Sequence, residues 1–226
     1  TMIPIQYLDA APELASDVST GAWAKLLWHG QFTPFGRPDA EPIPGTEFAM
    51  AHDGDNLYVA VKASALKGET QEELARENVQ IQLDPERRGQ RSGIFVCYTD
   101  GKASAAIELQ AGGKEGWMGE IGYAVHLKPG VWSMVLKVPL GQLSHRDNGL
   151  HKIHFNVTRL VEEKVGVGRL SYPALEAMSF WQPCNAVGEA VFERPDLLEA
   201  FSWGVQRAGR GQIDRGPGEV VCRQAV

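Results

Sequence analysis

The chain has 226 residues, of which 43% are hydrophobic and 22% are charged, and this composition excludes a disordered or fibrous protein. Its formal net charge of −6 argues against a nucleic-acid backbone or an anionic membrane as the main partner. No stretch approaches the ~20 consecutive apolar residues of a membrane-spanning helix. The 25 glycines and 13 prolines favour many short strands joined by turns.

The cysteines and the first residues give little information about function or location. Cys97, Cys184 and Cys222 form no CxxC motif, so a zinc or dithiol-redox site has no support. The start, Thr1-Met2-Ile3-Pro4, lacks the basic and apolar regions of a signal peptide. Two locations therefore stay open: the cytoplasm if Met2 is close to the native start, and an extracytoplasmic site if a leader has been removed.

Apolar and polar residues alternate with a period of two in many segments after Gly45, which is typical of half-buried strands. The pattern predicts strands over residues 48–50, 57–61, 79–83, 94–99, 102–110, 121–127, 131–138, 153–158 and, closing the sheet, 201–205. Three pairs of these strands are predicted to be hairpins, because turn-forming residues separate them: Asp53-Gly54-Asp55-Asn56, Asp100-Gly101 and Pro129-Gly130.

One short helix interrupts the strands. Thr70 is followed three residues later by Glu73, which is the spacing of a capping box, and residues 71–77 are good helix formers. Eight to ten strands with a single helix predict an all-β fold, an antiparallel jelly-roll-like β-sandwich. We expect one domain over residues 1–206 and a Gly/Arg-rich tail or arm over residues 207–226.

No motif nominates a catalytic centre. His151 and His154 resemble a metal pair, but an odd spacing on a strand places them on opposite faces. Gly-x-Ser-x-Gly, His-Glu-x-x-His and phosphate-loop motifs do not occur. A catalytic set assembled from distant residues stays open, but the sequence favours a protein that is not an enzyme.

Two predicted strands carry polar groups that are suited to hydroxyl recognition. Gln80 and Gln82 lie two residues apart and share one face, and Asn156 and Thr158 do the same on another strand. A carboxamide offers both donors and an acceptor, which matches neutral hydroxyl groups. The alternative for each pair is the solvated outer face of a sandwich. Trp181 lies in loop-like sequence and is the preferred candidate for stacking on a sugar ring.

The order of several segments resembles family-9 carbohydrate-binding modules over residues 23–205. These segments are 57–61, 78–84, 132–140, 155–159, 180–183 and 192–195. The resemblance implies a jelly-roll β-sandwich, a non-catalytic role in glycan binding, and in many members a structural calcium ion. Related DOMON-type domains bind haem or sugars.

The resemblance also implies a set of sugar-binding residues, from which this sequence departs. Where similar modules place one stacking Trp this chain has Leu74, the usual acidic residue of the strand is replaced by Gln80, and a second stacking Trp is matched by Phe192. Trp117 or Trp181 would have to replace the missing ring. We therefore expect an oligosaccharide or polysaccharide partner, bound at 10⁻⁵ to 10⁻³ M as an order of magnitude. Six residues are expected to contact it: Trp181 and Phe192 by stacking, and Gln80, Gln82, Asn156 and Arg159 by hydrogen bonds.

Three other functions stay open. A haem domain of the same fold would need an inward-facing Met with a partner such as His126, and Met134 is the available Met. An enzyme would need a buried acid or His in a deep pocket, for which Glu108, Glu120, His126 and His154 are the candidates. A scaffold without a small ligand is the third. For Arg159, an ion pair with Glu162 or Glu163 is the structural alternative to sugar contact.

Overall fold

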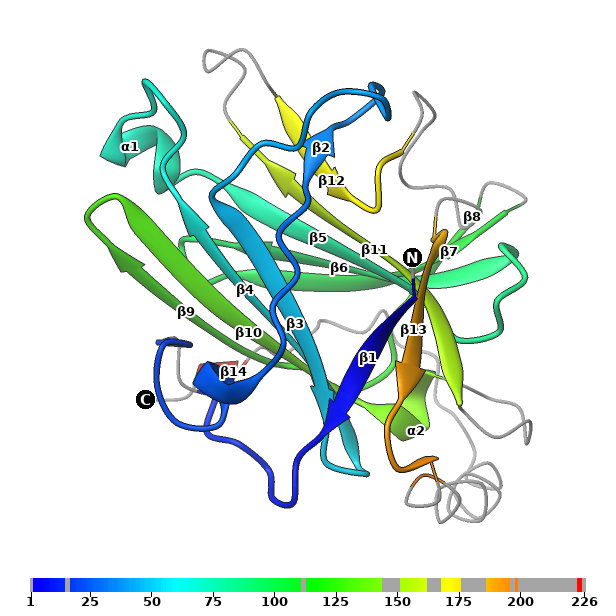
Figure 1. Cartoon of the computed structure of the whole chain (residues 1–226). Helices are drawn as coiled ribbons and strands as arrows, with labels where there is room; N and C mark the ends of the chain where they lie inside the picture. Colours follow the sequence, from blue (N-terminus) through cyan, green and yellow to red (C-terminus); the bar gives the residue numbers. More distant parts are fainter. Residues whose placement is uncertain are drawn as a thin grey trace.

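Two β-sheets pack face to face in the computed structural model, which describes residues 2–14, 17–110, 113–143, 151–161, 168–175, 186–195, 198 and 223–224 (Figure 1). This arrangement is the predicted all-β sandwich. Among the described residues, no helix is both long and apolar enough to cross a membrane.

One layer, called here the β4 sheet, has the strand order β9-β10-β4-β3-β1. Its strands are β1 (Met2–Tyr7), β3 (Thr46–His52), β4 (Asn56–Ser64), β9 (Gly122–Lys128) and β10 (Val131–Pro139). A two-residue strand, β14 (Arg223–Gln224), pairs with β9 in parallel at the edge. The backbone of this short segment is the described part of the predicted tail.

The other layer, called the β11 sheet, has the order β13-β11-β5-β6-β7-β8, with β12 and β2 continuing from β11. Its strands are β2 (Thr33–Pro34), β5 (Asn78–Asp84), β6 (Arg91–Tyr98), β7 (Ala103–Leu109), β8 (Gly113–Gly116), β11 (Lys152–Leu160), β12 (Arg169–Tyr172) and β13 (Gly188–Phe192). β1 joins the two sheets, because residues 2–5 pair with β13 and residues 6–7 pair with β3. Both pairings are parallel. The sequence predicted an antiparallel sandwich, and β1 is an exception to it.

The predicted turns and helix start are confirmed. Gly54, Gly101 and Gly130 have φ angles of +93°, +91° and +74° in the three hairpin turns, and only glycine adopts this region without strain. Thr70 caps α1 (Gln71–Leu74) through the full capping box with Glu73. α1 is shorter than expected, and α2 (Leu140–Leu143) and a 3₁₀ turn, η1 (Trp23–Lys25), were not predicted.

The predicted alternation holds in the main strands. One face of β4, with Leu57, Val59 and Val61, is buried between the sheets. On the other face, Tyr58 and Ala60 lie under the N-terminal segment, where Val18, Trp23 and Leu26 form a second apolar cluster. Trp23 is buried, and Trp117, one of the two residues considered as a replacement stacking ring, is also buried, with its ring centroid 4.9 Å from that of Phe95.

Candidate functional site

The outer face of the β11 sheet carries a row of polar side chains that crosses four strands. Gln80 of β5 lies directly opposite Thr158 of β11, Thr158 lies opposite Ser171 of β12, and Ser171 lies opposite Thr33 of β2. The neighbouring residues in β5, β11 and β12 point the other way, into the apolar core. We call these four residues the polar row.

A second group of polar residues lies beside the polar row. Gln82 of β5 lies opposite Asn156 of β11, and its side-chain Nε2 donates to Ser92 Oγ at 3.0 Å. Thr158 Oγ1 donates to Asn156 Oδ1 at 3.3 Å, which connects this group to the polar row. The structure therefore brings together three of the six predicted site residues: Gln80, Gln82 and Asn156.

The polar row is buried rather than solvated, since its members are 0–7% exposed. Three of its atoms, Gln80 Oε1, Thr33 Oγ1 and Ser171 Oγ, have no hydrogen-bond partner among the described residues. Leaving a buried polar atom unsatisfied costs about 1–3 kcal/mol. Such atoms in a native fold are normally satisfied by water or by a bound molecule.

Arg159 does not join the polar row, which corrects its predicted role as a sugar donor. An odd spacing from Thr158 turns its side chain to the core, where it is fully buried. Its Nε donates to both Glu77 oxygens at 3.0 and 3.1 Å, and its Nη2 lies 2.8 Å from Glu77 Oε1. Nη2 also lies 3.4 Å from Glu69 Oε2, and Nη1 donates to Thr46 Oγ1 at 2.9 Å. The ion pair expected as the alternative is thus present, but with Glu77 and Glu69; Glu162 and Glu163 lie outside the described residues.

The electrostatics of this cluster are dominated by burial. Burial raises the pKa of Glu77 to about 7, although the attraction of Arg159 and hydrogen bonds from Arg159 and Trp132 favour the ionised form. Trp132 Nε1 donates to Glu77 Oε2 at 2.5 Å. The cluster ties β11, the segment before β5 and β10 together across the sandwich, so its role is structural.

Of the predicted stacking residues, Phe192 is a core residue. It is 2% exposed, and its ring centroid lies 5.2 Å from that of His52 in an edge-on contact. The structure therefore corrects its assignment to a ligand surface. Trp181 lies outside the described residues, and the buried Trp117 does not replace it on a surface.

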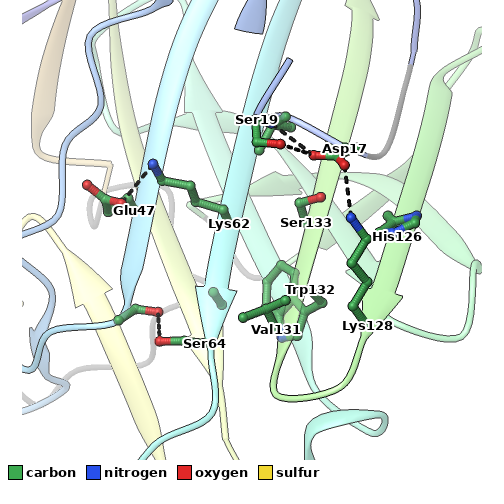
Figure 2. Close-up of a pocket in the computed structure, with 13 residues that line it drawn as sticks. Asp17, Ser19, Glu47, Lys62, Ser64, His126, Lys128, Val131, Trp132 and Ser133 are labelled. Atoms are coloured by element: carbon green, nitrogen blue, oxygen red, sulfur yellow. Dashed lines mark hydrogen bonds and ion pairs between the residues drawn. The ribbon is translucent and has the colours of Figure 1, made fainter. Parts of the chain in front are cut away.

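A pocket on the outer face of the β4 sheet was missed by the sequence reasoning (Figure 2). It is lined mainly by residues of β3, β4, β9 and β10 and by residues 17–19 of the N-terminal segment. Alternation could have placed Lys62 and His126 on outer faces. The sequence could not show that the two strands carrying them are close together in space.

Three other predictions concern a calcium ion, a haem group and an enzyme site. In the parts of the chain that the structure describes, no three His, Cys, Asp or Glu side chains converge as metal ligands, and the structural calcium ion stays a prediction. His126 lies opposite Ser133 and faces outward, whereas Met134 faces the core, so the two side chains point to opposite faces of the sheet and do not converge on one haem iron. Of the enzyme candidates, His126 lines the pocket on the β4 sheet, whereas Glu108 and His154 lie in the β11 sheet outside it and Glu120 is exposed.

Comparison with known proteins supports the fold. Neither protein-family models nor curated protein sequences give a match. Among solved structures, a candidate carbohydrate-binding protein from Bacteroides uniformis matches with a TM-score of 0.62 and 14% identity over 85% of this chain and 99% of that one.

Two structures of a family-9 carbohydrate-binding module from Caldicellulosiruptor kristjanssonii also match. The complex with cellotriose gives a TM-score of 0.58 at 14% identity, covering 85% of this chain and 94% of that one. The complex with glucose gives 0.53 at 15% identity, covering 85% and 96%. The chain therefore has the β-sandwich fold of family-9 carbohydrate-binding modules.

Proposed function

We propose that the chain is a non-catalytic module that binds a glycan on the outer face of its β11 sheet. The observation that carries the proposal is the polar row, in which Gln80, Thr158, Ser171 and Thr33 are direct cross-strand neighbours. Three of its oxygen atoms have no partner in the described part of the chain. Two solved structures of similar fold contain bound cellotriose and glucose, which supports a sugar as the ligand by analogy.

The dimensions of the polar row suit an oligosaccharide better than a single sugar. Neighbouring strands lie about 4.8 Å apart, so a row over four strands spans about 14 Å. Gln80 Oε1 would accept a hydrogen bond from a sugar hydroxyl, while Thr33 and Ser171 can both donate and accept. Gln82 and Asn156 would extend the contact beside the row, and Trp181 remains the proposed stacking ring.

Recognition of this kind involves no bond breaking. Hydrogen bonds to a glycan replace hydrogen bonds to water, so each contributes only about 0.5–1.5 kcal/mol net. A dissociation constant on the order of 10⁻⁵ to 10⁻³ M follows, with affinity rising as the oligosaccharide grows along the row.

The substitution Gln80→Leu tests the proposal. It removes the carboxamide but keeps a side chain of similar size, and because Gln80 Oε1 has no partner in the described structure, the fold should tolerate the change. Gln110→Leu, at an exposed position beyond the end of β7, is the matched control. A glycan array first identifies a ligand, and calorimetry then measures its affinity for each variant.

We expect Gln80→Leu to weaken binding about fivefold to tenfold, the loss of one or two net hydrogen bonds. Gln110→Leu should bind as the wild type does. The proposal fails if no glycan binds, or if both variants keep wild-type affinity for the glycan that does.

A further inference from the structure

The pocket on the β4 sheet has a floor made of two cross-strand rows. In the first row Glu47, Lys62, Ser133 and His126 are direct neighbours across β3, β4, β10 and β9. In the second row Ser64, Val131 and Lys128 are neighbours across β4, β10 and β9. Asp17 and Ser19 form a wall beside the floor (Figure 2), and Val18 also lines the pocket.

The pocket lies beside the part of the β4 sheet on which the N-terminal segment packs. The next row of the same face, Ala49-Ala60-Val135-Ala124, is small and apolar. Its Ala49, Ala60 and Val135 pack against the apolar cluster of the N-terminal segment. The rows that line the pocket are instead polar and charged, and they enclose about 330 Å³. This volume lies at the lower end of the range for small-molecule sites.

All four formal charges that line the pocket are already paired with one another. Lys62 Nζ lies 2.9 Å from Glu47 Oε2, and Lys128 Nζ lies 2.9 Å from Asp17 Oδ2. Hydrogen bonds from Ser19 and Lys128 hold the pKa of Asp17 well below its usual value, so it stays a carboxylate at neutral pH. The two pairs lie at opposite ends of the floor, and their charges cancel (Figure 2).

This pairing decides which ligand chemistry fits. An ammonium group has three donors and a carboxylate has about four acceptor positions, so each paired group keeps capacity for further hydrogen bonds. A charged ligand would have to compete with the existing ion pairs. A neutral ligand with several hydroxyl groups can bond to both ends without breaking either pair.

Three further features in and beside the pocket favour a ligand of this kind. His126 Nε2 is buried at the pocket and has no hydrogen-bond partner in the described structure. Lys62 Nζ also lies 4.3 Å from the centroid of the Trp28 ring, a cation–π contact that restrains the lysine. Val131, which is 43% exposed, gives an apolar surface for the C–H groups of a ligand.

We propose that this pocket is a second binding site, which takes a neutral polyhydroxylated molecule of monosaccharide size. It lies on the opposite outer face of the sandwich from the polar row and stands on its own geometry. His126 Nε2 and the Lys62 and Lys128 ammonium groups would bind hydroxyl groups of the ligand.

An NMR titration of the full chain with D-glucose and myo-inositol tests this site. D-glucuronate and L-lysine serve as charged comparison probes. We expect the backbone amide signals of Lys62, His126 and Ser133 to shift with a millimolar dissociation constant for at least one neutral probe, and to shift less with either charged probe. No shift at these amides with either neutral probe, or tighter binding of glucuronate or lysine, would overturn the proposal.

Matched variants identify the binding groups. His126→Phe should weaken the neutral probe at least fivefold, whereas His151→Phe, at an exposed position outside the pocket, should not. Lys62→Met should also weaken binding of the neutral probe at least fivefold. Lys102→Met, which breaks a surface ion pair outside the pocket, is its control and should not. If His126→Phe and Lys62→Met each bind the neutral probe as tightly as their control variants, these two side chains do not bind the ligand. Because amides of β5 and β11 report the polar row separately, failure here is distinguishable from failure of the proposed function.

Discussion

Replacing Arg159 with Met should destabilise the protein strongly, because it leaves two carboxylates in the core without their cation. The guanidinium approaches Glu77 at 2.8–3.1 Å and Glu69 at 3.4 Å, and all three side chains are fully buried. Removing one partner from a buried ion pair typically costs about 3–5 kcal/mol. This is a large part of the roughly 5–15 kcal/mol that holds most domains folded.

The loss should depend on pH in a defined direction. Burial raises the pKa of Glu77 to about 7, so between pH 4.5 and pH 7 the folded state binds more protons than the unfolded state. The free energy of unfolding contributed by Glu77 therefore falls as the pH rises through this window. Without Arg159 the pKa of Glu77 rises further, so the variant should lose more stability at pH 8 than at pH 5.5.

Urea unfolding at the two pH values measures both effects. Arg76→Met, which breaks the exposed pair with Glu72, is the control and should cost less than about 1 kcal/mol. The double variant Arg159→Met/Glu77→Leu should recover part of the loss, because it removes one of the two carboxylates left without a cation. A loss below about 1 kcal/mol for Arg159→Met, or an equal loss at both pH values, would show that Arg159 does not neutralise these carboxylates in the core. A glycan affinity that falls in the folded double variant would contradict the placement of Arg159 on the face away from the polar row.

Two further predictions concern the helix cap and the metal. Thr70→Ala removes the side-chain oxygen that accepts from Glu73 N and should lower the free energy of unfolding by about 1 kcal/mol, measured in urea; an unchanged midpoint would show that the cap contributes nothing. If a structural calcium ion is bound, as the family resemblance implies, adding EDTA should lower the Tm and added calcium should restore it. A Tm unaffected by the chelator contradicts the calcium expectation.

The sequence predicted the fold where local patterns and turn chemistry agree. Long strands such as β4 and β10 alternate apolar and polar residues, and the hairpins contain glycines that the turns require. Strands of two to four residues, such as β2, β8 and β12, are too short to show a period. The parallel pairing of β1 depends on segments far apart in the chain, which no local pattern reports.

The candidate site was predictable in part for the same reason. The alternation of side chains along a strand was enough to place Gln80 on the same face as Gln82, and Asn156 on the same face as Thr158. Register was needed to show that these two pairs face each other. The same alternation predicts that Arg159, which follows Thr158 directly, points to the opposite face of the sheet.

The pocket on the β4 sheet could not be predicted from sequence. Its floor joins residues from four strands, and its wall comes from a segment more than a hundred residues away from β9 and β10. Lys62, Ser133 and His126 become neighbours only through the register of β4, β10 and β9.

The most direct test of glycan binding on the β11 sheet follows the side-chain amide signals of Gln80 and Gln82 by NMR while cellotriose is added. We expect these signals to shift in proportion to the bound fraction, while the exposed Gln110 side-chain amide signal stays unchanged. If cellotriose binds and the Gln80 and Gln82 signals do not move, the glycan does not bind on the β11 sheet.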